Sequence, residues 1–206
     1  MPVKFLAGGL TEKEVAARGL DYPTDLGRAK KLLADAGYPT GFPLEVVTSE
    51  LPGYRVLYES MQAQLAKVGI RVAVKVVDHP TMHSMIRKDA NPLVIYIAWR
   101  PNADVYLTQF FHSESVVVTG KKPNVNFAHY DKIDTLIGEA RTETDQAKQV
   151  TRWKEAQLKI LEDMVAYPIQ YQNQVYARGT AVDYGHELIS VLALYPGITE
   201  KTRLVK

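Results

Sequence analysis

Apolar residues recur every three or four positions in three stretches of the first half of the chain, which predicts three amphipathic helices. The first spans residues 24–36, where Thr24 or Asp25 can cap the N-terminus. The second spans residues 53–68, and the third, which follows Asp78 as its cap, spans residues 81–88. Each stretch gathers its apolar side chains on one helical face, a pattern typical of helices that pack against a core.

Strand patterns separate these helices. Residues 44–49 form a short apolar segment, and residues 70–77 alternate apolar with polar side chains. Residues 93–98 are apolar without interruption, which is typical of a strand covered on both faces. The order strand, helix, strand, helix, strand predicts an α/β fold with a mixed, mostly parallel sheet flanked by helices.

Helical periods dominate the second half. Residues 104–112 predict a short helix, and residues 131–143 and 145–164 predict two more, the first of them capped by Asp131. A strand is predicted over residues 167–178, with its proline at the start or edge. The tail that follows has two apolar patches, at residues 188–195 and at Ile198, but no recognisable period.

Composition narrows the function classes. The 206 residues carry 25 basic and 23 acidic side chains, and no basic block appears, so nucleic acid is not an expected partner. The absence of cysteine excludes disulfides, thiol nucleophiles and cysteine-ligated metals. The first residues lack a signal-peptide pattern, which taken alone favours a cytoplasmic protein.

Motifs for catalysis and cofactors are weak. The chain has no GxSxG, GxxxxGK[ST] or GxGxxG, so we expect no cofactor. His79 and His83 have i, i+4 spacing, but a metal site needs a third ligand, and Pro80 places His79 in the first helical turn. We therefore expect no metal.

Two acid–base pairs keep an enzymatic alternative open. Asp78 precedes His79, and His129 stands two residues before Asp131. Adjacent residues on a turn rarely point at one reacting atom, and no nucleophile has a recognisable spacing. A small hydrolase or transferase is thus an alternative, and a protein-interaction module is a third.

The stretch from Tyr96 to Asp104 is the sharpest candidate site. A buried strand is predicted to run into a polar loop that carries Trp99, Arg100 and Asn102. Ligands in open α/β sheets bind beyond the carboxyl ends of strands, and indole and guanidinium groups are effective ligand contacts. The structural alternative is that Trp99 plugs the core while Arg100 and Asp104 form an ion pair.

Five segments of the chain resemble the peptide/nickel class of extracellular solute-binding proteins that serve ABC importers. They occur in the order found in that family and cover nearly all of residues 24–178. The segments are AKKLLADAGYPTGFPLEVVT, MQAQLAKVGIRVAVKVVDHPTM, AWRPNADVYLTQFFHS, NFAHYDKIDTLIGEARTETDQAK and WKEAQLKILEDMVAYPIQYQNQVYA.

The resemblance implies that the chain is one lobe of a two-lobed binding protein. Such proteins enclose a solute between hinged lobes and do not act as enzymes. The matching part is the C-terminal one, so we expect an exported, periplasmic protein of which this chain is a fragment without its N-terminal lobe. Residues 1–23 would be a hinge-side lead-in, residues 24–178 the solute-binding lobe, and residues 179–206 a return segment. The expected partners are a small-molecule or peptide ligand, the missing lobe and a membrane ABC permease.

The resemblance also implies a gripping edge. Trp99 matches the Trp of the family's Trp-x-x-Asp segment, whose Asp meets a peptide's ammonium group, but Asn102 stands in the position of that Asp. Asp104 is a substitute carboxylate, and His79 and Tyr96 are expected on the same rim. This departure leaves peptides, opines, oligosaccharides and metal chelates open as ligands. An exposed tail is also expected to dimerise a lone lobe as an artefact.

Overall fold

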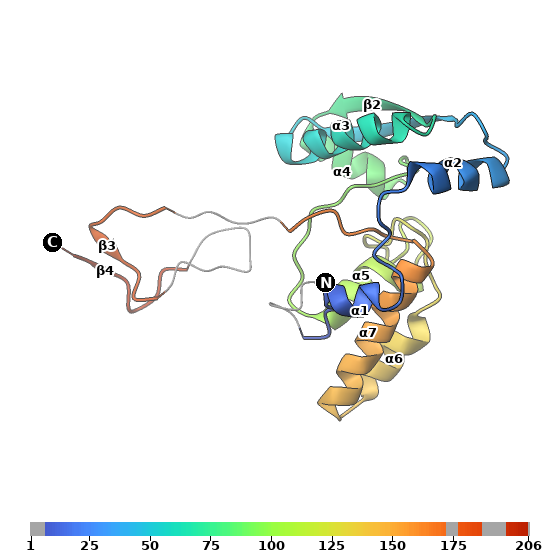
Figure 1. Ribbon diagram of the computed structural model, residues 1–206. Coiled ribbons are helices and arrows are strands. Elements are labelled where there is room, and N and C mark those ends of the chain that lie inside the picture. The colour runs from blue at the N-terminus through green and yellow to red at the C-terminus, as the bar shows by residue number, and fades with distance from the viewer. Residues whose placement is uncertain (1–6, 172–176, 187–196, 206) are drawn as a thin grey trace.

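The computed structural model describes residues 7–171, 177–186 and 197–205 and shows a mixed α/β chain (Figure 1). Helices and strands match the predicted order over most of this length. The elements are α1 (Glu12–Ala16), α2 (Leu26–Asp35), β1 (Pro43–Ser49), α3 (Pro52–Ala66), β2 (Arg71–Val77), α4 (His79–Arg87), α5 (Ala103–Phe111), the 3-10 turn η1 (Ser113–Ser115), α6 (Asp134–Thr142), α7 (Gln146–Glu162), β3 (Val182–Asp183) and β4 (Arg203–Leu204).

β1 and β2 form a parallel pair joined by α3, as predicted. The register runs from Pro43 opposite Arg71 to Ser49 opposite Val77. The two strands begin at a close backbone crossing, where a Cβ on Gly41, whose φ is +74°, would collide with the Gly69 carbonyl. Only glycine tolerates both that approach and a positive φ. This crossing fixes where the strand pair starts.

The predicted N-caps of the first and third helices are confirmed. Asp25 accepts a hydrogen bond from the Arg28 amide at 2.8 Å, and Asp78 accepts one from the Thr81 amide at 2.9 Å. Each carboxylate satisfies an amide that has no partner within its own helix. α2 forms as predicted but buries none of its residues.

The sheet unit, which comprises β1, α3, β2 and α4, has an apolar core on both sides of Tyr54 and Tyr58. Val46, Val72 and Ile95 pack around Tyr58, while Met82 and Ile86 of α4 pack with Tyr54. Both tyrosines lie on α3 one turn apart. α3 and α4 thus both pack on the strand pair and meet each other at Tyr54.

The predicted strand at residues 93–98 is wrong: this segment has no strand pairing in the structure. Hydrogen bonds from side chains take the place of those that a neighbouring strand would make. The Tyr58 hydroxyl donates to the Leu93 carbonyl at 3.1 Å and accepts from the Ile95 amide at 2.9 Å. At the β1 edge, the Asn91 amide exchanges two hydrogen bonds of 2.8 Å with the Val47 backbone. These side chains bond the backbone groups that a neighbouring strand would otherwise bond. The apolar segment therefore has its backbone satisfied without forming a strand.

The helical unit consists of α5, α6 and α7, with α1 beside α7 (Figure 1). Its core is formed by Leu107 and Phe111 of α5, Ile133 and Ile137 at α6, and Ile160 of α7. The segment before α2 is fastened to α7, since the hydroxyl of Tyr22 donates to the Leu161 carbonyl at 2.9 Å and Lys154 pairs with Glu14 at 2.6 Å.

The predicted capping role of Asp131 is wrong, because Ile133 stands at the N-cap of α6 without a side-chain bond. Asp134 of the first turn instead accepts a hydrogen bond from the Ser113 amide at 3.0 Å. The partner lies 21 residues earlier in the chain. That long-range contact sets the start of α6.

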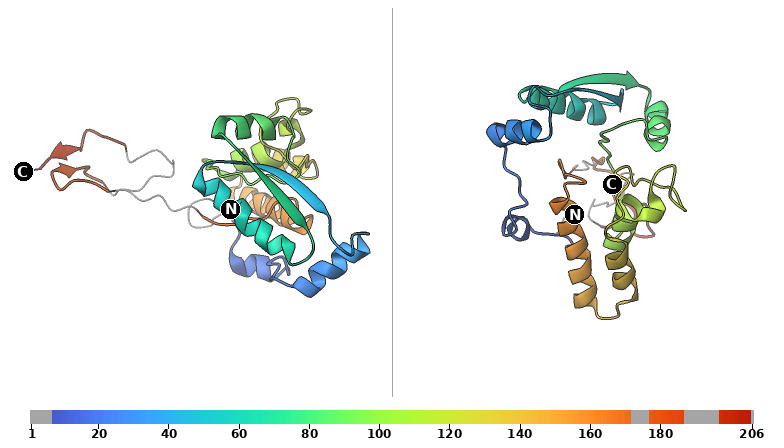
Figure 2. Two further views of the ribbon diagram at one scale, coloured as in Figure 1. Left: turned by 90° about the horizontal axis from the view of Figure 1, so that it is seen from above. Right: turned by 90° about the vertical axis from the view of Figure 1, so that its right-hand side faces the viewer.

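The predicted strand at residues 167–178 is also wrong over residues 167–171 and 177–178, while 172–176 fall outside the described residues. β3 and β4 pair antiparallel in the tail and extend away from the rest of the chain (Figures 1 and 2). The apolar patch predicted over residues 188–195 also falls outside the described residues. In the described ranges, no helix has the length and apolar character needed to cross a membrane.

Candidate functional site

The carboxyl end of β1 and the start of α4 bring the first candidate residues together. Ser49 ends β1 fully buried, and its Oγ accepts a hydrogen bond from the Leu51 amide at 3.1 Å. Asp78 caps α4, so His79 is the first helical residue, as predicted. The His79 Nδ1 lies 3.0 Å from the Ser49 Oγ. Two chain segments thus meet at a strand end, where ligands of α/β proteins bind.

Three residues spaced by four along α4 continue this contact as a relay of hydrogen bonds. The Nε2 atoms of His79 and His83 lie 3.1 Å apart, and the Arg87 Nη1 lies 3.0 Å from the His83 Nδ1. Arginine can only donate, so the His83 Nδ1 accepts and its Nε2–H donates to His79. The His79 Nδ1–H then donates to Ser49. This order requires both imidazoles to be neutral.

The electrostatics agree with that assignment. Burial, followed by the electrostatic influence of His79 and Arg87, lowers the pKa of His83 below its usual 6.5. A proton added to His83 at Nδ1 would face the Arg87 N–H group. The relay is therefore intact only while His83 is uncharged.

The histidine spacing is compatible with two ligands of one metal, but the surroundings are not. A neutral His83 that bound metal through Nε2 would carry its proton on Nδ1, where Arg87 already donates. Among the described residues, no group of three or more His, Asp or Glu side chains is placed to hold a metal ion. The geometry therefore favours a hydrogen bond between the two imidazoles over a metal bound by both.

A line of ring contacts, here called the aromatic row, extends from this relay. Tyr54 lies 5.3 Å from His79 between ring centroids, His79 lies 4.4 Å from His83, and His83 lies 5.7 Å from Tyr96. Tyr96 lies 5.7 Å from Phe110 of α5. The aromatic row therefore joins the sheet unit to the helical unit through rings that pack mainly edge to face, with polar groups beside them.

The loop of Trp99 and Arg100 adjoins the end of this row. Trp99 is 38% exposed, which argues against its plugging the core. The Arg100 guanidinium lies 5.0 Å from the centre of the Phe110 ring and hydrogen-bonds to Gln109 and, at 2.7 Å, to the Trp99 carbonyl. Arg100 is thus stacked on the row, and no carboxylate among the described residues pairs with it.

Asn102 and Asp104 have roles within the fold. The Asn102 Oδ1 caps α5 by accepting from the Val105 amide at 2.9 Å. Asp104 pairs with Arg141 of α6 at 2.8 Å, so the alternative ion pair of Asp104 with Arg100 is wrong. The Asp104 carboxylate, which the sequence offered as a substitute anchor for a ligand's ammonium group, is thus already neutralised by Arg141.

Neither acid–base pair suggested by the sequence forms in the structure. Asp78 serves as a helix cap, and His129 pairs at 2.9 Å with Asp89 instead of Asp131. Sequence reasoning also missed Tyr54 and Arg87 as members of the site. The repeat of four from His79 to Arg87 was the available signal.

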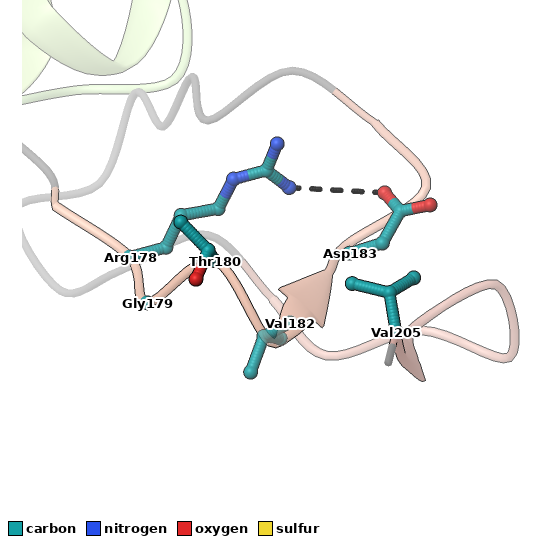
Figure 3. Close-up of a pocket in the computed structure, with 6 residues that line it drawn as sticks. All are labelled: Arg178, Gly179, Thr180, Val182, Asp183 and Val205. Carbon is teal, nitrogen blue, oxygen red and sulfur yellow. Dashed lines mark ion pairs between the residues drawn. The ribbon is translucent and has the colours of Figure 1, made fainter.

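A separate hollow lies in the tail, beside β3 (Figure 3). Its polar lining is dominated by Asp183, which pairs with Arg178 at 3.7 Å and with Arg203 at 3.0 Å. A hydrogen bond from the Gly185 amide and the one from Arg203 lower the pKa of Asp183. Two guanidiniums thus share the Asp183 carboxylate, and the hollow shares no residue with the aromatic row.

Comparison with known proteins gives a consistent family signal. Residues 6–116 match the family model described as Bacterial extracellular solute-binding proteins, family 5 Middle. The glutathione-binding protein GsiB of Pectobacterium atrosepticum is 30% identical to the chain over 151 residues, which cover 69% of this chain and 29% of that protein.

Solved structures of similar fold come from the same kind of protein. The binding protein MoaA of A. tumefaciens R10, in complex with mannopinic acid, is 40% identical with a TM-score of 0.74, over 88% of this chain and 37% of that one. DppA of Helicobacter pylori, in complex with peptide STSA, is 26% identical with a TM-score of 0.60, over 70% and 28%. The chain spans about a third of the length of these relatives.

Proposed function

The chain belongs to family 5 of the bacterial extracellular solute-binding proteins, and from this we propose that it forms part of a clamp that binds a small solute for import. The observation that carries the proposal is the aromatic row at the carboxyl end of β1, bordered by the Trp99 loop. Ring faces with a few oriented polar groups are what solute sites are built from. We propose that the solute is held without chemical conversion.

The proposed ligand contacts are His79 and Tyr96 in the row, with Trp99 and Arg100 at its end. Asn102 uses its oxygen for the α5 cap, which leaves its amide N–H groups to donate to a ligand acceptor. Asp104 lies at the same edge, but its pairing with Arg141 makes it a poor anchor for an ammonium group. These contacts favour solutes rich in acceptor oxygens.

The proposed ligand class is a peptide-like or opine-like solute. MoaA binds mannopinic acid, GsiB binds glutathione, and DppA binds a short peptide, so these three compounds make a rational solute panel for this chain. Within the described ranges, the Trp99 edge offers no carboxylate free of an ion pair, which ranks acids above plain peptides that need an ammonium anchor.

The proposed architecture is a hinged pair of lobes. Residues 24–178 would be one lobe, residues 1–23 would approach it from the hinge, and residues 179–206 would return toward the other lobe. Closure of the two lobes would trap the solute, and the closed form would dock on a membrane ABC permease. We place the whole protein in the periplasm, in keeping with an extracellular family.

Isothermal titration calorimetry tests this proposal. The protein as its gene encodes it is titrated with each member of the solute panel, and so is the 206-residue chain. We expect micromolar or tighter binding of one panel member by the encoded protein and much weaker binding by the 206 residues alone. Equal affinities would contradict the two-lobed clamp, and turnover of the solute would contradict binding without conversion.

A further inference from the structure

Two arginines stand at the ends of the Tyr96–Phe110 ring pair. Arg87 donates from Nη2 to the Tyr96 hydroxyl at 3.2 Å, and Arg100 lies over the Phe110 ring. The two rings are 5.7 Å apart. Both guanidiniums therefore border the same short section of the aromatic row, although they come from α4 and from the loop before α5.

Neither guanidinium is within ion-pair distance of a carboxylate in the described part of the chain, whereas several other arginines are so paired. Arg87 bonds to the His83 ring, the His83 carbonyl and the Tyr96 hydroxyl. Arg100 bonds to Gln109 and to the Trp99 carbonyl. The arginines that do have a carboxylate partner are Arg18, Arg55, Arg141, Arg152, Arg178 and Arg203.

Neutral partners orient these guanidiniums without cancelling their charge. A guanidinium has five N–H donors in a planar fork, so each of the two keeps donors beyond its intramolecular bonds. The fork matches a carboxylate in a two-point arrangement, and bonds between charged partners are about twice as strong as neutral ones. Both side chains are thus ordered in advance for an anionic group.

The surrounding charges leave the arginines uncompensated. The imidazoles of the relay carry no negative charge, and Asp104 is matched by Arg141. Asp78 is occupied at the N-terminus of α4, and Glu50 lies at the opposite end of the relay, where Ser49 contacts it at 3.3 Å. None of these carboxylates therefore compensates the charges of Arg87 and Arg100.

We propose that Arg87 and Arg100 receive the carboxylate of an acidic solute that lies against Tyr96 and Phe110. This inference rests on the proposed solute-binding function and specifies the chemistry of the ligand. The Asn102 amide N–H groups add neutral donors at the same edge. The site then selects acids over their neutral derivatives.

The test pairs each member of the solute panel with its carboxamide derivative and measures affinity by calorimetry, with the protein as its gene encodes it. We expect the acid to bind about ten- to a hundredfold more tightly than the amide, as one charged hydrogen-bonded contact provides. Arg87→Gln and Arg100→Gln should each remove at least about tenfold of that preference and leave amide affinity unchanged. Raising the salt concentration should weaken acid binding alone.

Arg71→Gln is the matched control, because Arg71 also bonds to a neutral carbonyl, that of Gly69 at 3.4 Å, on an exposed strand away from the row. It should change neither affinity. Thermal unfolding checks that each variant folds. Because Arg87 and Arg100 lie in different elements, one site variant remains a valid test if the other does not fold. Acid and amide affinities that are equal, or that fall together in both site variants, would overturn the inference while leaving solute binding intact. Binding of no panel member would instead overturn the proposed function and this inference with it.

Discussion

The Asn91 side chain takes the place of a neighbouring strand at the edge of β1, and its removal should destabilise the sheet unit. Its amide exchanges two 2.8 Å hydrogen bonds with the Val47 N–H and carbonyl groups. Asn91 is only 6% exposed and Val47 8%. Asn91→Ala therefore leaves two buried backbone groups without partners.

The size of the effect follows from those two groups. Each unsatisfied buried group costs about 1–3 kcal/mol, and partial entry of water into the space left by the amide reduces the total, so we expect a loss of about 3 kcal/mol. In a protein of this size, about 1 kcal/mol lowers Tm by about 2–4 °C, so Tm should fall by about 6–12 °C. Because β1 ends at Ser49, the relay to His79 should loosen as well.

Urea unfolding followed by far-UV circular dichroism measures the free energy of unfolding. Asn124→Ala is the control, since Asn124 is exposed and should cost less than about 0.5 kcal/mol. A second variant, Asn91→Asp, keeps the shape but sets a carboxylate against the Val47 carbonyl, which raises the pKa of the introduced group above its unfolded value. Its deficit should thus shrink as the pH falls from 7 toward 4, because the folded state binds the proton more tightly. A loss below about 1 kcal/mol in Asn91→Ala would refute the reasoning.

Three further predictions concern the strand crossing, the relay and the tail. Gly41→Ala should prevent or severely weaken folding by forcing a Cβ into backbone, whereas Gly138→Ala in α6, where a Cβ meets nothing within 4 Å, should stabilise by about 0.5–1 kcal/mol in thermal unfolding. The lowered pKa of His83 means that the unfolded chain binds a proton on this residue more readily than the folded chain does. The contribution of His83 to stability should therefore be full above pH 6.5 and fall as the pH drops below it. NMR titration should give a His83 midpoint below 6.5, and His83→Gln should flatten the pH dependence of stability. Ile198 and Leu204 are 83% and 84% exposed, so the 206-residue chain should self-associate in sedimentation velocity, and Ser at both positions should reduce that association; a monomer at all concentrations would count against it.

Local signals predicted the elements well where a single period and a cap agreed. The N-caps Asp25 and Asp78 appear as expected, since each cap depends on residues within one turn. The β1–β2 pair also appears, as the strand–helix–strand order predicted. The predicted strand at 93–98 was wrong because strand formation needs a neighbouring backbone. In this chain, side chains of Tyr58 and Asn91 supply those bonds from other segments.

The candidate site likewise combines features that the sequence predicts with features that only tertiary contacts determine. The sequence by itself determined the repeat of four from His79 to Arg87 and the approach of Trp99 to the end of an apolar segment, because both are properties of neighbouring positions. Only the tertiary structure decided that Asp104 is neutralised by Arg141, 37 residues away. It also decided that Arg100 lies over the Phe110 ring, where no carboxylate in the described part of the chain pairs with it. Charge matching depends on distances in space between segments remote in sequence, so the spacing of residues along the chain could not reveal it.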